Sequence, residues 1–158
     1  MTRYAQSTTV AADKSRAEIE KILARYGADQ FLYGWEVGQA VVAFRAHGRQ
    51  IRFTLPMPDR NDEEFTLTPA RRTRRSAEQI EAAYDQAVRQ RWRALALVIK
   101  AKLEAVETGI TEFEDEFMAQ IVLPDGQTVG AFMKPQIAIA YDRGHMPKLL
   151  PAPGSSSE

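Results

Sequence analysis

The chain has 158 residues. This length suits one domain with a core that is stable without disulfide bonds or structural metal ions. It contains no cysteine, which excludes disulfides, thiolate metal sites and a cysteine nucleophile, and its net charge of zero argues against a surface that is basic throughout. The longest apolar run, residues 94–99, is far shorter than the roughly 20 residues of a membrane span. We therefore expect a cytoplasmic protein without a membrane partner.

Residues 1–12 are polar and small, and we predict that they form a flexible lead. Ser15 and Glu18 have the spacing of a capping box, in which each side chain satisfies a free backbone amide at the start of a helix. Apolar side chains then follow at helical spacing, at Ile19, Ile22, Leu23 and Tyr26. Gly27 is the expected end of this first helix.

Three strands are predicted next, joined by two-residue turns at residues 37–38 and 47–48, each of which contains glycine. These turns fix the register, because each sets which residues face one another. The predicted partners are Trp35 with Ala40, Tyr33 with Val42, Phe31 with Phe44, Phe44 with Ile51, Val42 with Phe53, and Ala40 with Leu55. All of these side chains share one face of the sheet, so the two turns agree on the apolar face.

The segment 57–75 is predicted to be a mobile charged loop. A long helix then runs from about Ser76 to Gly109, and Ser76 with Gln79 has the spacing of a second capping box. Its apolar stripe recurs every three or four residues, at Ile80, Tyr84, Val88, Trp92, Leu95, Ile99, Leu103 and Val106. We expect this helix to cover the apolar face of the sheet.

Thr111 and Glu114 suggest a third capping box, opening a short helix with Phe113, Phe117 and Met118 turned inward. A last helix is predicted over residues 129–143, ended by Gly144, and residues 145–158 are predicted to be a tail. The predicted fold is therefore α+β. It consists of a helix, a three-stranded antiparallel meander, a long helix packed on one sheet face and two short C-terminal helices, in one domain over residues 1–144.

The aromatic residues Phe31, Tyr33 and Trp35 could in principle form a stacking platform for single-stranded nucleic acid. They share the apolar face of the predicted sheet, however, so we interpret them as core residues. Tyr84 and Trp92 receive the same interpretation from their place in the helical stripe.

The neutral total charge conceals two opposite blocks. Residues 71–102 carry nine Lys or Arg against three Asp or Glu, and residues 103–126 carry seven Asp or Glu and no Lys or Arg. The blocks could neutralise each other within one chain, if the helices around Gly109 pack side by side. Alternatively, the basic block of one copy could meet the acidic block of another head to tail, which would give a homo-oligomer.

Enzyme motifs are weak. The second and third strands lack the acids that a restriction-type nuclease uses to hold a metal, and the two histidines, His47 and His145, fall in a turn and in the tail. The acidic groups at 59–64 and 112–116 are typical of a solvated surface and of helix starts. We predict no catalytic residue, metal ligand or cofactor, and a small enzyme with a dispersed site stays open.

Clustered arginines are the best functional signal, because the planar guanidinium suits phosphate contacts. We predict a non-enzymatic accessory protein that binds single- or double-stranded nucleic acid. The candidate contacts are Arg45, Arg49, Arg52, Arg71, Arg72, Arg74, Arg75, Arg89 and Arg93.

The alternative prediction is a protein-interaction module or inhibitor that acts through the acidic segment 104–116, where a row of acids can imitate nucleic acid. Its candidate contacts are Glu112, Glu114, Asp115 and Glu116.

Residues 98–107, and the run 122–129 with Pro135 and Tyr141, resemble those of uncharacterised small proteins of bacteriophages and actinobacterial genomes. That family has no assigned activity, so the resemblance implies a phage or mobile-element context and no particular chemistry. The order of helix, β-meander and long helix is also loosely similar to the core of phage strand-annealing proteins, at the level of the fold alone.

Overall fold

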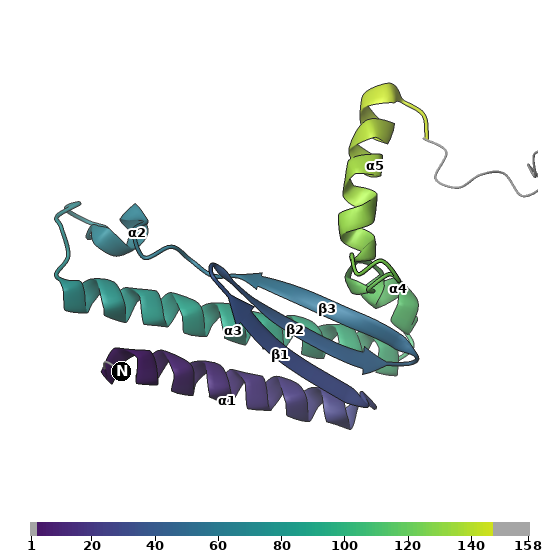
Figure 1. Cartoon of the computed structure of the whole chain (residues 1–158), viewed down its shortest axis with the longest axis horizontal. Helices are drawn as coiled ribbons and strands as arrows, with labels where there is room; N and C mark the ends of the chain where they lie inside the picture. The colour runs from purple at the N-terminus through teal and green to yellow at the C-terminus, as the bar shows by residue number, and fades with distance from the viewer. Residues whose placement is uncertain (1–2, 147–158) are drawn as a thin grey trace, which may run out of the picture.

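The computed structural model describes the backbone of residues 3–146 and the side chains of residues 13–146. Its architecture is α+β, as predicted (Figure 1). The elements are α1 (Arg3–Arg25), β1 (Gln30–Glu36), β2 (Gln39–Ala46), β3 (Arg49–Pro56), α2 (Glu63–Thr66), α3 (Ala77–Glu107), α4 (Phe113–Phe117), the 3-10 turn η1 (Met118–Gln120) and α5 (Val129–Arg143). None of these helices is long and apolar enough to cross a membrane.

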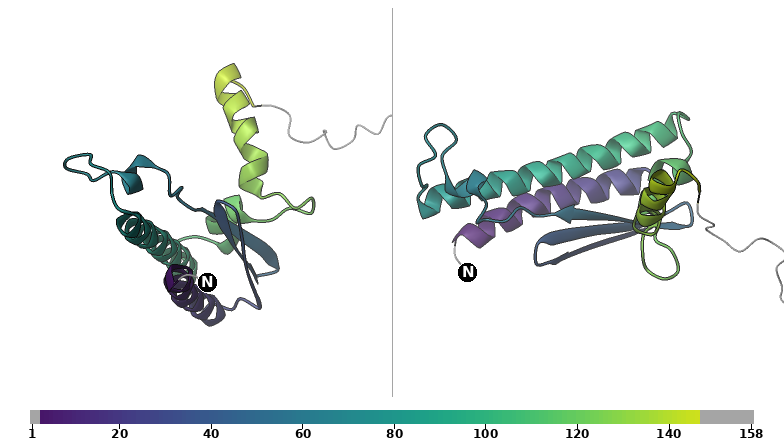
Figure 2. Two further views of the ribbon diagram at one scale, coloured as in Figure 1. Left: turned by 60° about the vertical axis from the view of Figure 1, so that its left-hand side comes forward. Right: turned by 90° about the horizontal axis from the view of Figure 1, so that it is seen from above.

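The three strands form an antiparallel sheet in the order β1-β2-β3. The predicted register is confirmed at every pair, from Phe31 opposite Phe44 in the first hairpin to Val42 opposite Phe53 in the second. Helices α1 and α3 lie side by side on one face of this sheet (Figures 1 and 2). The helices and the sheet therefore form two layers.

The core lies between these layers. The side chains of Trp92 and Ile99 from α3 and of Val42 and Ile51 from the sheet are almost completely buried, and Phe117 of α4 closes one end. Rings pack edge to face there, with centroids 5.9 Å apart for Phe44 and Phe117. The helical stripe predicted for α3 is thus the side of the helix that faces the core.

The start of α1 differs from the prediction. The helix already begins at Arg3, so Ser15 lies inside it, and the described residues of the predicted lead are helical. A good capping sequence fixes a helix start only where nothing else extends the helix. Here α1 packs along the much longer α3, and packing stabilises a helix beyond its local propensity.

Segment 57–75, which was predicted to be a mobile charged loop, contains regular structure. It contains α2, whose Phe65 is buried with its ring centroid 5.8 Å from that of Tyr84 on α3. Beyond α2 the chain doubles back, with an isolated bridge between Leu67 and Arg74 and a 2.8 Å hydrogen bond from Arg75 N to Thr66 O. The prediction considered only the charged residues of this segment, and it missed the buried Phe65 that packs α2 on α3.

The capping box at Ser76 is confirmed, with Gln79 N donating to Ser76 Oγ at 3.3 Å and Ser76 N donating to Gln79 Oε1 at 2.9 Å. The box predicted at Thr111 is wrong, since Glu112 occupies the N-cap of α4 without a side-chain hydrogen bond. Phe113 and Phe117 are buried as expected, but Met118 is 48% exposed.

Helix α5 stands away from the two-layer body (Figure 1), and none of its residues is buried. Thr128 caps its start and Gly144, with φ of 67°, ends it as predicted. Of the predicted tail 145–158, residues from 147 onward lie outside the described part of the chain.

Candidate nucleic-acid interface

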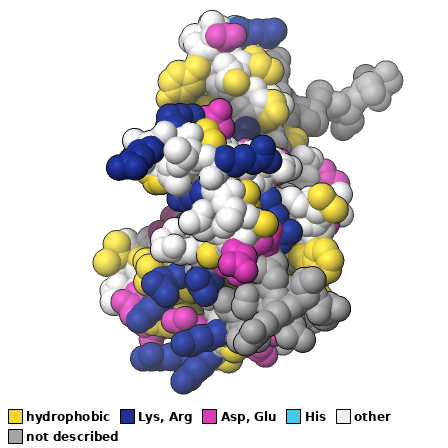
Figure 3. All heavy atoms as spheres, turned by 90° about the vertical axis from the view of Figure 1, so that its left-hand side faces the viewer, with side chains coloured by type: hydrophobic (Ala, Val, Ile, Leu, Met, Phe, Trp, Pro, Cys, Tyr) yellow, Lys and Arg dark blue, Asp and Glu magenta, His cyan; other side chains and the backbone are white. Residues whose placement is uncertain are grey.

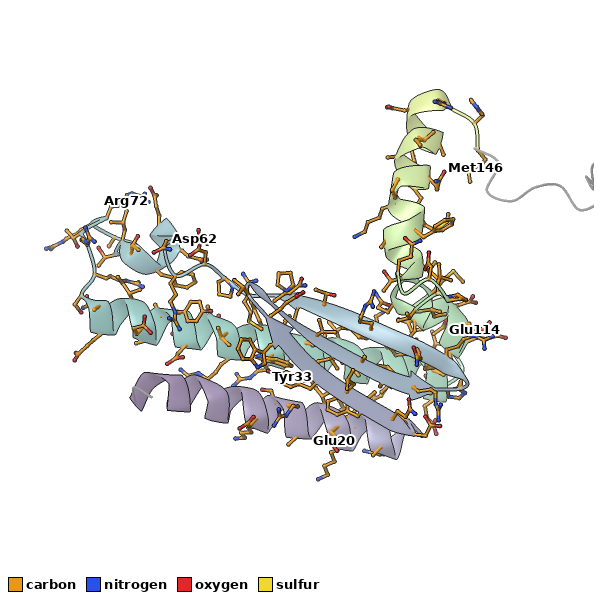
Figure 4. All side chains as sticks on the ribbon, viewed as in Figure 1. Glu20, Tyr33, Asp62, Arg72, Glu114 and Met146 are labelled. Atoms are coloured by element: carbon orange, nitrogen blue, oxygen red, sulfur yellow. The ribbon has the colours of Figure 1, made fainter. Side chains whose placement is uncertain are left out.

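The structure does not bring the nine predicted arginines together on one surface. Arg45, Arg49 and Arg52 lie near the second hairpin, at the end of the molecule that also holds α4. Arg71 to Arg75 lie beyond α2 at the other end, as the labels of Arg72 and Glu114 mark in Figure 4. The two ends are separated by much of α3, which is about 45 Å long at 1.5 Å per residue.

The hairpin arginines are held by partners within the chain. Arg45 makes a two-pronged contact with Asp29, with Nε at 2.9 Å from one carboxylate oxygen and Nη2 at 2.8 Å from the other. Hydrogen bonding to Arg45 lowers the pKa of the Asp29 carboxyl below its usual value. Arg49 pairs with Glu114 at 2.5 Å, and Arg52 donates to Gly126 O at 2.8 Å. These three side chains mainly join neighbouring segments of the fold.

The loop arginines divide into two kinds. Arg72 forms an ion pair with Glu63, and the half-buried Arg75 donates to Glu64 O at 3.5 Å. Arg71 and Arg74 are exposed, and neither makes an ion pair with another described residue. Figure 3 views this end of the molecule and shows Lys and Arg side chains in separate groups, with acidic and neutral side chains between them.

The acidic candidates are divided in the same way. Glu114 pairs with Arg49, and Glu116 pairs with Lys102 at 3.2 Å, whereas Glu112 and Asp115 are exposed. Lys102 to Glu116 is the one ion pair that joins the basic block 71–102 to the acidic block 103–126 among the described side chains. Helix α4 is too short to run back along α3, so the two blocks do not neutralise each other within this part of the chain.

A groove that the sequence did not predict lies toward the end of the molecule where α3 begins. Its volume is about 910 Å³, within the range of small-ligand sites. Its walls come from α1, the β1–β2 hairpin, the segment after β3 and the first half of α3. We call it the aromatic groove, because Tyr33, Trp35, Tyr84 and Trp92 all line it.

Trp35 is the residue whose environment departs most from expectation. It lies opposite Ala40 and on the predicted face, yet its side chain is 76% exposed, so its interpretation as a core residue is wrong. Trp35 lines the groove between this hairpin and the helices, together with Arg16 of α1 and Val88 of α3. Tyr33, two residues earlier, is half-buried with its ring centroid 5.4 Å from that of Trp92.

Two arginines lie over the rings of the groove. The Arg16 guanidinium is 4.7 Å from the centroid of Tyr33, and that of Arg60 is 4.5 Å from the centroid of Tyr84. Arg16 also pairs with Asp13 at 2.9 Å, and Arg60 lies 3.8 Å from Glu81. Burial raises the pKa of the Tyr33 phenol above its usual value.

Besides its arginines, the charged groups of the groove are Asp13, Glu36 and Asp59. Its described lining contains no serine, threonine, lysine or histidine that could act as nucleophile or general base. Among its acids, Glu36 accepts a hydrogen bond from Gln39 and Asp59 caps the amide of Asn61 at 2.9 Å. Within the described residues, no group of three or more acids and histidines is arranged to hold a metal ion.

Comparison of the chain with protein-family models, curated proteins and solved structures found no match to any of them.

Proposed function

We propose that this protein binds single-stranded nucleic acid in the aromatic groove, as a non-enzymatic accessory protein of a phage or mobile element. The observation that carries the proposal is the exposure of Trp35 at a groove with further rings and two arginines. An exposed tryptophan offers a flat face on which any base can stack, and such stacking contributes about 1–3 kcal/mol per base. The mobile-element context rests on the sequence resemblance alone.

Phosphate contacts in this proposal fall to Arg71 and Arg74. Both are exposed and have no ion-pair partner among the described side chains, and they flank Arg72, which Figure 4 labels near the start of α3. Arg16 and Arg60 are already stacked on rings and placed beside acids, so they contribute mainly by holding those rings in position. Bases in a duplex cannot reach the rings without unstacking, so single strands are the preferred ligand.

The proposal is tested by fluorescence anisotropy with labelled single- and double-stranded DNA and RNA, at low and at moderate salt. We expect Trp35→Ala to weaken single-strand binding by an amount equivalent to about 1–3 kcal/mol. The matched control is Tyr141→Ala, because Tyr141 is an 88% exposed ring on α5, away from the groove, and its removal should leave binding unchanged. Both variants should retain the stability of the unchanged chain, since neither ring is buried.

The charge contribution is measured separately. Changing Arg71 and Arg74 together to Ala should reduce the slope of log affinity against log salt by about 0.7 for each phosphate contact that is lost. Changing Arg49 and Arg52 together to Ala is the control, because these arginines already bind Glu114 and Gly126. An absence of binding at low salt, or equal losses from Trp35→Ala and Tyr141→Ala, would overturn the proposal.

A further inference from the structure

The side of α3 opposite the groove carries an exposed stripe of unusual composition. Groove-lining Val88 and exposed Leu97 lie nine positions apart, which places them on opposite sides of a helix with 3.6 residues per turn. The stripe advances by three or four positions and consists of Gln86, Gln90, Arg93, Leu97, Ala101, Glu104 and Thr108, all exposed. Leu97 at its centre is 62% exposed and the adjacent Val98 is 45% exposed.

Charge changes sign along this stripe. Arg93 in the stripe and Arg89 beside it lie on the N-terminal side of the apolar centre. Glu104 in the stripe and Glu107 beside it lie on its C-terminal side, with the exposed Lys100 between the centre and Glu104. The two arginines and the two glutamates are all exposed, and none of the four forms an ion pair with another described side chain. Glu104 and Glu107 lie in the last turn of α3, where the helix dipole favours bases over acids.

The same order is self-complementary when two copies of α3 run antiparallel. In such a pair, related by a two-fold axis, residues equally far from the midpoint on either side face each other. The pairs Arg89 with Glu107, Arg93 with Glu104, and Ala94 with Ala101 all have their midpoint within half a position of Val98. Opposite charges therefore face each other along one flank of the helix pair. On the other flank, the small alanine side chains allow the two helices to approach closely.

We propose that α3 is the interface of a two-fold symmetric homodimer, in which the stripe of one copy packs antiparallel on the stripe of a second copy. Leu97 of both copies lies at the axis, and each of the pairs Arg89–Glu107 and Arg93–Glu104 forms twice. This differs from a head-to-tail assembly, which would leave one charged end of each chain unsatisfied and would continue into a filament. The interface is on the opposite side of α3 from the groove and does not depend on the proposed function.

The size of the interface sets the concentration at which it should be studied. From Gln86 to Thr108 the stripe is about 33 Å long at 1.5 Å per residue. A single helix pair of this length is smaller than a standard interface, which buries about 800 Å² on each partner. We therefore expect a reversible dimer with a dissociation constant on the order of micromolar, weakened by salt because its ion pairs are exposed.

The test uses sedimentation equilibrium of the full chain over about 1–200 µM, a range that brackets the expected constant. One variant combines Arg89→Glu with Arg93→Glu, and the other combines Glu104→Lys with Glu107→Lys. Each reverses charges on one half of the stripe, so like charges meet in its homodimer, and we expect each variant to dimerise at least about tenfold more weakly. Lys134→Glu with Arg143→Glu on α5 is the matched control for the arginine reversals, with the same change in net charge and unaltered dimerisation.

Mixing the two reversed variants in equal amounts gives the decisive measurement. In an antiparallel pair of one with the other, every charged contact is again attractive, so the mixed dimer should form at the affinity of the unchanged chain. Because one variant is acidic and the other basic along the whole stripe, the mixture tests charge pairing between copies. The unchanged chain tests the orientation, since a parallel pair of two unchanged copies would place like charges against each other. The proposal is overturned if the unchanged chain is monomeric throughout the range, if the reversals leave dimerisation unaltered, or if the mixture stays monomeric. All four positions are exposed, and circular dichroism verifies that each variant is folded.

Discussion

At the level of single residues, the contact between Arg45 and Asp29 shows how a surface ion pair joins two elements. Asp29 lies between α1 and β1, and its backbone amide also donates to Arg45 O at 3.0 Å. Main chain and side chains thus connect the same two residues, with two side-chain bonds of 2.9 and 2.8 Å. The chain therefore enters the sheet at a fixed position, and the predicted phosphate contact at Arg45 instead has a structural partner.

This pair makes stability depend on pH in a defined direction. The pKa of Asp29 is lower in the folded chain than in the unfolded chain, because Arg45 binds the ionised form. The stabilising contribution is therefore fully present above the unfolded pKa of about 3.9 and is lost as the pH falls through the folded value. We expect Asp29→Asn to reduce the fall in unfolding free energy between about pH 5 and pH 3.

Urea unfolding of both chains across that pH range provides the measurement. Asp115→Asn is the control, because Asp115 is exposed and forms no ion pair with another described residue. The effect should be small, since both partners of the Arg45 contact lie at the surface. If Asp29→Asn and Asp115→Asn gave the same pH dependence as the unchanged chain, Arg45 would not be holding the carboxylate.

At the level of elements, the sequence was sufficient wherever local chemistry and long-range packing agree. Two glycine turns each determine the register of a hairpin, and both place the same side chains on one face, so β1 to β3 were predictable in full. The capping box of α3 is followed by an apolar stripe that the core requires, so its start was predictable too. Local and tertiary signals reinforce each other there.

The candidate site was not predictable for the converse reason. The pattern of alternation correctly assigned Trp35 to the face of Tyr33, but alternation cannot tell how closely the covering helices pack on each residue of that face. The groove lies between the β1–β2 hairpin and the two helices, where Trp35 is left exposed. Phe65 is a second example, because a single aromatic residue in a charged loop has no periodicity, although it anchors α2 on α3.

The two serines of predicted capping boxes now lead to opposite expectations. Ser76 caps α3 with both reciprocal hydrogen bonds, so Ser76→Ala should lower the free energy of unfolding by about 1 kcal/mol. Ser15 lies inside α1, where alanine has a higher helix propensity, so Ser15→Ala should be neutral or stabilising by up to about 0.5 kcal/mol. Urea unfolding of the two variants measures both values. A loss on Ser15→Ala as large as that on Ser76→Ala would mean that α1 begins at Ser15 in solution.

At the level of the whole molecule, α3 links surfaces with different properties. Its groove side carries Tyr84, Val88 and Trp92, and its outer side carries the stripe centred on Leu97. A ligand in the groove and a second copy on the stripe would therefore occupy opposite sides of one helix. With two-fold symmetry, the two grooves of a dimer would lie on opposite sides of the helix pair, so each copy could bind a strand independently.

Helix α5 should contribute little to the stability of the two layers formed by the sheet and by α1 and α3. Its described residues include none that is buried, although Gly130 at its start is close enough to η1 that an added Cβ would lie 2.9 Å from Ala119 O. The core cluster contains no residue of α5. A chain that ends at Thr128 should therefore unfold with the same urea midpoint as the full chain, while its helical circular dichroism signal falls.

The truncation retains the bridge between Ile51 and Ile121 and the 2.8 Å hydrogen bond from Val122 N to Gln50 O, so the segment that follows η1 keeps its attachment to β3. Because unfolding free energy depends on buried surface, we expect a change within about 0.5 kcal/mol. A much larger loss would show that α5 is covered in solution, and its dependence on protein concentration would then tell whether a second copy covers it. Together with the charge-reversed α3 variants, the truncation separates assembly through α3 from any contribution of α5.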